Sequence, residues 1–233
     1  MDPVVLAALV TAIGGVIAAL ITARRNNDKK AEKLSASATS TFHKIPLPDS
    51  RRFDLPWGNE PNPPLEYCFN NVPFLFREGT ANRINGTQIS FGDEITVSVD
   101  IPNAKAIYFM LNAEYAFHDL GKAVSGRYRQ IGEITLTFSN GTTLSEPLIM
   151  GVNIRDWCFN NSSAITTLEP NHHHVIQAWR ATGERGLIMD MLTVEWKNTS
   201  HLKSVTIRNH LSSEITPDSK PGILVWAITC KVI

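Results

Sequence analysis

The sequence predicts an all-β domain, built as a sandwich or barrel, that follows a single N-terminal transmembrane helix. Pro3 to Ala23 form an uncharged, mostly apolar run. From about Ile45 onward, short β-rich runs recur at intervals of about ten residues and are separated by turn residues. No segment after residue 44 has the sustained helical period of apolar side chains that a long amphipathic helix needs.

The apolar run is long enough to cross a bilayer. At a rise of about 1.5 Å per residue it gives about 31 Å of helix, against a hydrocarbon core of about 30 Å. Only Met1 and Asp2 precede it. Basic residues follow it closely: Arg24, Arg25, Lys29, Lys30 and Lys33. Because the positive flank stays inside, we expect a single-pass membrane protein with a cytoplasmic C-terminal domain. An extracellular domain and a cleaved signal peptide are the alternatives.

Small residues recur along one face of this predicted helix. Ala7, Thr11, Gly15 and Ala19 are spaced by four residues. Such a stripe lets two helix backbones approach closely in a bilayer, where packing drives association. The pattern therefore predicts a homo-oligomer formed through the membrane helix. The alternative is that the stripe only reflects the high Ala and Gly content of membrane helices.

A polar segment separates the anchor from the β-rich part. Residues 24–44 contain almost no large apolar side chains, and the Ser/Ala/Thr-rich stretch 35–41 has nothing to bury. The sequence therefore predicts a transmembrane anchor at 1–23, a basic and Ser/Thr-rich linker at 24–44, and a β-sandwich binding domain at 45–233.

Alternation of apolar and polar residues marks two strands of this domain. Residues 95–101 and 134–138 show the period of two expected of half-buried strands. Asn140-Gly141 and Asn85-Gly86 are hairpin turn signals. The apolar runs 106–111 and 223–229 predict central strands covered on both faces. Further strands are expected at 65–69, 73–76, 105–111, 143–149, 174–179, 187–196, 203–208 and 222–232.

Composition limits the partners. Twenty-two basic and twenty-two acidic residues leave no net charge, so we expect no nucleic acid partner. The basic cluster behind the anchor suits the headgroups of the lipid bilayer. Cys68, Cys158 and Cys230 are too far apart to form a paired zinc motif, and reduced thiols agree with a cytoplasmic domain. No cofactor and no metal are predicted.

The order of several motifs resembles a galactose-binding-like jelly-roll domain, the carbohydrate-binding-module-like kind appended to agarase-like glycoside hydrolases. The similar elements are YFML (108–111), IGEITLTFSNGTT (131–143), GVNIRDW (151–157), QAW (177–179), LTVEWKN (192–198), LKSVTIRN (202–209) and ILVWAIT (223–229), with NNVPFLF (70–76) upstream. The likeness extends from near Phe53 to Ile233, and no segment of these residues resembles the hydrolase catalytic domain. It implies a non-catalytic jelly-roll β-sandwich that holds a sugar at its loop ends.

Sugar binding needs an aromatic ring for stacking and planar polar groups for hydroxyls. Arg155, Asp156 and Trp157 supply a guanidinium, a carboxylate and an indole at a predicted strand end. Trp57, in a loop, and Trp179, beside Arg180, are secondary candidates. The alternative is that Trp157 caps the core and that Arg155 pairs with Asp156 or another carboxylate on the surface.

The histidines at 172–174 form an exposed loop in preference to a metal site, because consecutive residues on an extended segment point to opposite faces. The sequence contains no nucleophile elbow, no phosphate-binding loop and no supported Cys/His pair. We therefore expect that the chain is not an enzyme.

Two functional classes remain open. One is a membrane-anchored, non-catalytic binding protein that recognises a carbohydrate or similar polar ligand. The other is an oligomeric membrane effector or scaffold, capable of pore formation, whose cytoplasmic β-sandwich senses a ligand or binds a partner. The resemblance supports the first class, whereas the positive flank, the cysteines and the small-residue stripe support the second.

Overall fold

The computed structural model describes residues 40–49, 52–56, 65–79, 83–114, 128–158, 165–170, 174–180, 186–210 and 222–233. The chain divides into two units, Met1–Ser40 and Thr41–Ile233, and the description concerns the second. The predicted membrane helix, with its stripe of small residues, lies outside the described residues. In the part that the structure describes, no helix has the length and hydrophobicity that a membrane crossing requires.

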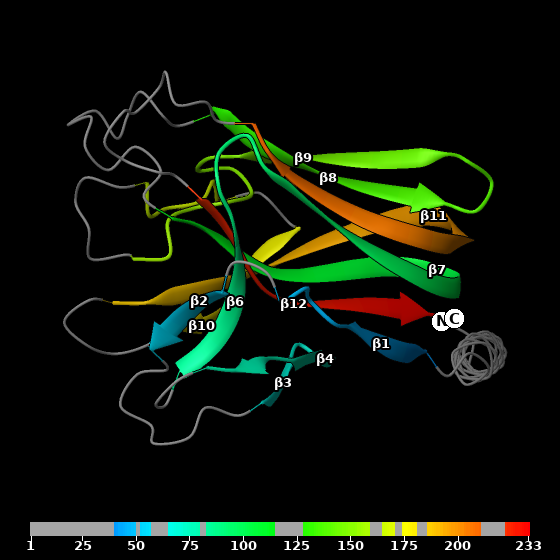
Figure 1. The fold of residues 1–233 in the computed structure, drawn as a ribbon, viewed down its shortest axis with the longest axis horizontal. Coiled ribbons are helices and arrows are strands. Elements are labelled where there is room, and N and C mark those ends of the chain that lie inside the picture. Colours follow the sequence, from blue (N-terminus) through cyan, green and yellow to red (C-terminus); the bar gives the residue numbers. More distant parts are fainter. Residues whose placement is uncertain are drawn as a thin grey trace, which may run out of the picture. The chain divides into compact units, whose positions relative to one another are not determined.

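Every regular element of the described residues is a β-strand (Figure 1). The strands are β1 (Thr41–Ile45), β2 (Arg52–Pro56), β3 (Glu66–Phe69), β4 (Val72–Leu75), β5 (Arg77–Glu78), β6 (Arg83–Ile89), β7 (Glu94–Glu114), β8 (Gln130–Phe138), β9 (Thr143–Ile149), β10 (Val175–Arg180), β11 (Ile188–Asn209) and β12 (Gly222–Val232). The prediction of an all-β domain is therefore confirmed for this part of the chain. Strand β1 begins at Thr41, inside the segment predicted to be linker.

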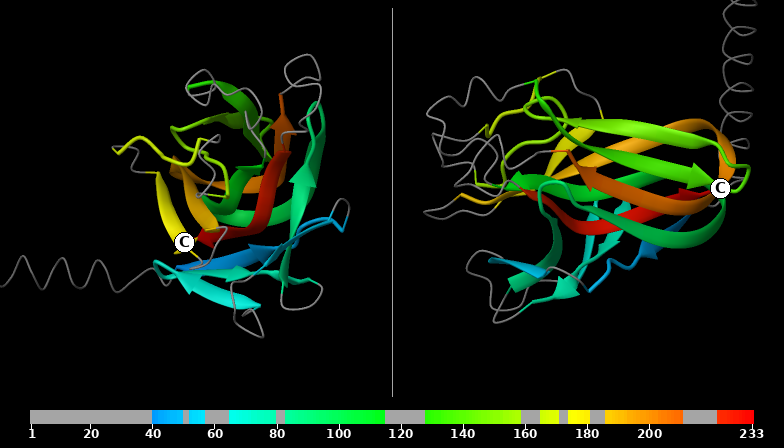
Figure 2. Two further views of the ribbon diagram at one scale, coloured as in Figure 1. Left: turned by 90° about the vertical axis from the view of Figure 1, so that its left-hand side faces the viewer. Right: turned by 45° about the horizontal axis from the view of Figure 1, so that its top comes forward.

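Two long antiparallel strands, β7 and β11, organise the fold. They pair along almost their whole length, from Asp190↔Leu111 to Arg208↔Glu94. The second half of β11 continues to β8 and then β9, whereas the second half of β7 continues to β12, which pairs with β6 and β1. Figures 1 and 2 show the resulting β-sandwich-like arrangement of two layers joined by the long strands.

The long strands change direction where their pairing is irregular. Register shifts interrupt the β7–β11 ladder between Glu195 and Ser204, and Asn103 in the facing part of β7 has a φ of 54°. Bulges of this kind bend a strand and increase its twist. The irregularity lets one strand contribute to both layers, which is why segments predicted as separate strands at 187–196 and 203–208 form one.

The main core lies between the two layers. It includes Ile134 and Val205 from one layer and Phe109, Leu111 and Val225 from the other, all almost fully buried. These residues alternate along their strands, as the period of two predicts. Burial of such side chains contributes about 1.5–3 kcal/mol each.

A second core covers the outer face of the β7–β12 layer. The side chains between the main-core positions of β7, namely Ala106, Tyr108 and Met110, face this side. They pack with Trp226 and with Phe74 from the β3–β4 hairpin. The central runs 106–111 and 223–229 are therefore buried on both faces, as predicted.

The two predicted hairpin turns have different outcomes. Asn140-Gly141 connects β8 and β9, and Gly141 has a φ of 80°, so this prediction is confirmed. The turn predicted at Asn85-Gly86 is wrong, because both residues lie inside β6. A Cβ on Gly86 would lie 2.5 Å from Cε3 of Trp226. The glycine is required for close packing of a ring, not for a turn.

Candidate functional site

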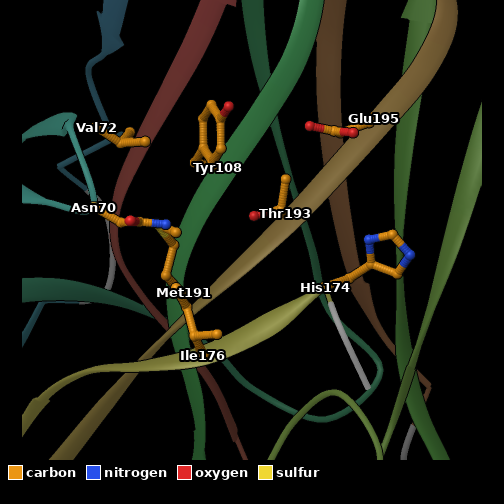
Figure 3. Close-up of a pocket in the computed structure, with 8 residues that line it drawn as sticks. All are labelled: Asn70, Val72, Tyr108, His174, Ile176, Met191, Thr193 and Glu195. Carbon is orange, nitrogen blue, oxygen red and sulfur yellow. The ribbon is translucent and has the colours of Figure 1, made fainter. Parts of the chain in front are cut away.

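An open groove lies on the outer face of the β7–β12 layer, beside the β3–β4 hairpin. Its volume is about 400 Å³, within the size range of small-ligand sites. The groove is lined by Asn70, Val72, Tyr108, His174, Ile176, Met191, Thr193 and Glu195 (Figure 3). The lining combines apolar side chains with the phenol of Tyr108, the amide of Asn70, the carboxylate of Glu195, the hydroxyl of Thr193 and the imidazole of His174.

The hairpin turn places Asn70 at the groove. The turn consists of Asn70 and Asn71, between the paired residues Phe69 and Val72. Both asparagines have positive φ values, 49° and 63°. Asparagine tolerates this left-handed conformation better than most residues, and two such residues in succession give the tight turn that fits strand twist.

The β7–β11 ladder positions Thr193 and Glu195 on the side of the groove opposite Asn70. Thr193 pairs directly with Tyr108, and Glu195 follows two residues later on the same face. The Thr193 amide donates a hydrogen bond of 2.7 Å to the carbonyl oxygen of His174, which fixes the start of β10 beside β11. In Figure 3, Tyr108 stands between Val72 and Glu195, with Thr193 and Met191 below it.

Tyr108 is the central side chain of the groove. The residue is 8% exposed, and the centroid of its ring lies 6.3 Å from that of Phe42. Burial raises the pKa of the phenol, and the nearby Glu195 carboxylate raises it further. The hydroxyl therefore stays protonated at neutral pH and can both donate and accept a hydrogen bond.

A second polar region lies at the loop end of the same layer, around Arg155. The Arg155 guanidinium donates from Nε and Nη2 to the two carboxylate oxygens of Asp190, each at 2.7 Å. It also donates to the Thr166 carbonyl oxygen and to Oε1 of Gln177, each at 3.1 Å. Nδ2 of Asn112 donates to Asp190 at 3.1 Å. We call these five residues the buried network, after the Arg155–Asp190 pair at its centre, although Gln177 is itself exposed.

The network holds its charges inside the protein. Asp190 is 1% exposed, and burial raises the pKa of its carboxyl group while the Arg155 hydrogen bonds oppose that rise. Arg155 therefore pairs with a buried carboxylate, that of Asp190, whereas the alternative placed its partner on the surface. A planar, bidentate pair of this kind is the geometry that best offsets the desolvation of two buried charges.

Asp156 and Trp157 are also buried, at 1% and 8% exposure. Oδ1 of Asp156 accepts a hydrogen bond of 2.9 Å from the Cys158 amide. Trp157 packs in the second core, and its amide donates to the Ala113 carbonyl oxygen at 3.1 Å. The role of Arg155, Asp156 and Trp157 as a sugar site stays a prediction, and this packing agrees with the core alternative.

Glu114 ends β7 close to Asp156. It is 1% exposed, and Nε2 of Gln88 donates a hydrogen bond to its Oε2. Burial raises the pKa of Glu114 to about 7, and the Asp156 carboxylate contributes in the same direction, while the Gln88 hydrogen bond opposes the shift. The Glu114 carboxyl group therefore keeps its proton to a higher pH than an ordinary glutamate does.

The remaining sequence candidates are dispersed. Trp179 is half-buried on β10 and packs against the second core. Trp57 lies outside the described residues, as do His172 and His173, whereas the exposed His174 lines the groove. Among the described residues, His174 lines the groove, whereas Arg155, Asp156, Trp157 and Trp179 are not part of its lining.

Sequence reasoning missed the groove residues Asn70, Tyr108, Thr193 and Glu195. The Asn-Asn pair between two short β-rich runs is a turn signal that locates Asn70. The alternation of Thr193 and Glu195 with apolar neighbours indicates their shared face. No sequence signal shows that the β3–β4 hairpin stops short of Glu195 and leaves the groove open. Compared with known proteins, the chain matches no family model and no curated protein.

Proposed function

We propose that this chain is a membrane-anchored, non-catalytic binding protein whose β-sandwich holds a carbohydrate or similar polar ligand in the groove beside Tyr108. The observation that carries the proposal is the composition of the groove lining. An aromatic ring and the apolar side chains of Val72, Ile176 and Met191 suit the hydrophobic face of a sugar ring. Asn70, Thr193 and Glu195 suit its hydroxyl groups.

The family resemblance supports the same class of ligand. A galactose-binding-like jelly roll is the finer fold that we propose for the described all-β domain. The proposal moves the site from the loop ends, where the resemblance implies it, to the outer face of the β7–β12 layer. The reason is that the loop-end residues Arg155 and Asp190 engage each other, whereas Glu195 forms no ion pair with any described residue.

The membrane part of the proposal rests on residues 3–23 and their basic flank. We propose a single-pass anchor that associates through Ala7, Thr11, Gly15 and Ala19, with the β-domain on the cytoplasmic side. Cys68, Cys158 and Cys230 all lie in the described part and form no disulfide, which suits a reducing compartment. Reporter fusions at residue 233 test the orientation. An active periplasmic-type reporter with a silent cytoplasmic one would reverse it.

A glycan array tests the binding function. The full chain is kept in a detergent without a sugar headgroup and is applied as wild type and as two variants, Thr193→Trp and Thr206→Trp. Both threonines are half-buried on β11, but only Thr193 lines the groove. We expect glycan binding by the wild type and by Thr206→Trp, and loss of it in Thr193→Trp. Equal signals from both variants would remove the groove as the site.

A further inference from the structure

The charge of the groove lining selects among carbohydrates. The lining contains one carboxylate, Glu195, and no lysine or arginine. Glu195 is exposed, and among the described residues it forms no ion pair. The lysines placed nearest to Glu195 are Lys197, two residues further along β11, and Lys231, which lies across Ala106 on β12, and both are outside the lining. An anionic ligand therefore meets repulsion from Glu195, and a cationic ligand meets attraction.

Tyr108 adds a second attraction for a cation at the same place. Its protonated phenol is close enough to Glu195 for the carboxylate to raise the phenol pKa, so both groups act on one part of the groove. A cationic group near this pair faces a carboxylate and an aromatic ring together, and aromatic rings attract cations through their π-electrons. Thr193 and Asn70 remain available on either side for neutral hydroxyl groups (Figure 3).

We propose, on the basis of the function proposed above, that the groove binds a sugar that carries a protonated amine, such as a 2-amino-2-deoxyhexose, with the ammonium group at Glu195. Replacing the ammonium by a hydroxyl removes the ion pair and retains the ring contacts. N-acetylation of the amine also removes the charge. The neutral and N-acetylated forms of one sugar therefore bind more weakly than the amine form, and uronic acids bind most weakly.

Matched oligosaccharides test this selectivity. The probes are tetramers of glucose, glucosamine and N-acetylglucosamine with the same β-1,4 linkage, together with galactose and galactosamine. Calorimetric titration uses the full chain in a detergent without a sugar headgroup, at pH 7 and low salt. We expect each amine to bind about tenfold more tightly than its neutral counterpart, a difference of about 1.4 kcal/mol. Raising the salt concentration should reduce that ratio.

Two glutamine variants distinguish the attraction of Glu195 for the amine from the attraction of carboxylates elsewhere on the surface. Glu195→Gln keeps the shape of the side chain and should reduce the amine preference to about twofold or less. Glu78→Gln, at an exposed position outside the lining, should leave the preference unchanged.

The possible failures are distinguishable. Equal affinity for the amine and neutral sugars would overturn the amine inference and leave the carbohydrate function standing. An amine preference that persists in Glu195→Gln or Thr193→Trp would also overturn the inference, because the attraction would then come from another surface. Absence of binding by every sugar would overturn the inference and the proposed function together.

Discussion

The buried network around Arg155 and the groove beside Tyr108 each contain a carboxylate, but the first carboxylate is buried in an ion pair and the second is exposed. In the network, the guanidinium and the Asp190 carboxylate are almost fully enclosed and satisfy each other. In the groove, the Glu195 carboxylate is exposed and forms no ion pair with any described residue. The comparison shows that charged residues near loops do not by themselves indicate a binding site. What distinguishes a site is a polar group that the protein leaves available.

The largest effect should come from breaking the network. Arg155→Met leaves the Asp190 carboxylate buried without its cation, and removal of one partner from a buried pair costs about 3–5 kcal/mol. Urea unfolding measures the loss. The control is Arg208→Met, since Arg208 pairs with Glu94 at the exposed surface and its loss should cost at most about 1 kcal/mol. Equal losses would contradict a structural role for the network.

Glu114 should make stability fall as pH rises. Its pKa is about 7 in the folded protein, against an ordinary value of 4.5, so the folded state holds the proton more tightly. The contribution of Glu114 to stability is therefore fully present below about pH 4.5 and is lost as the pH rises through about pH 7, by about 3 kcal/mol in total. Glu114→Gln should remove this part of the pH dependence.

The measurement is the unfolding free energy of the Glu114→Gln variant and the wild type at pH 5 and pH 8. The half-buried Glu133 on β8 provides the control, and Glu133→Gln should keep the wild-type slope. A Glu114→Gln protein with an unchanged slope would show that this carboxyl group is not the source of the pH dependence.

Substitution of Gly86 should cause a smaller loss of stability, and this loss should depend on the ring of Trp226. Gly86→Ala places a methyl group against Trp226 and within 3.1 Å of the Val225 carbonyl oxygen, and such overpacking costs about 1–3 kcal/mol. A double-mutant cycle with Trp226→Leu measures the coupling between the two positions. A coupling energy near zero would mean that the glycine is required for another reason.

Glu195→Gln should have the smallest effect on stability, within about 0.5 kcal/mol, because the side chain is exposed and has no described partner. The same urea titration measures it beside Arg155→Met. A loss comparable with that of Arg155→Met would place Glu195 in the structural framework and weaken its assignment to ligand binding.

The strands were predictable from the sequence because alternation reports burial directly. The period of two located β8 and the first half of β7, and unbroken apolar runs located the strands that are buried on both faces. The turn error at Asn85-Gly86 has a physical cause. A local dipeptide signal cannot reveal that Gly86 must make room for Trp226, which is far away in the sequence.

The sites were less predictable because their partners are distant in the chain. Arg155 and Asp190 are separated by 35 positions, so sequence proximity suggested Asp156 as one partner. Tyr108 lies in an apolar run that predicts complete burial. Its access to the groove depends on where the β3–β4 hairpin ends across the sheet, which no local pattern contains.

In our proposal the groove beside Tyr108, and not the Arg155–Trp157 segment, binds the ligand. The most direct test is the dissociation constant of the strongest array oligosaccharide, measured by calorimetry for Thr193→Trp and Trp157→Phe. Thr193→Trp fills the groove, whereas Trp157→Phe keeps an aromatic ring in the second core. We predict that Thr193→Trp lowers the affinity at least about tenfold and that Trp157→Phe leaves it unchanged. Loss of binding in Trp157→Phe, with wild-type affinity in Thr193→Trp, would contradict the claim.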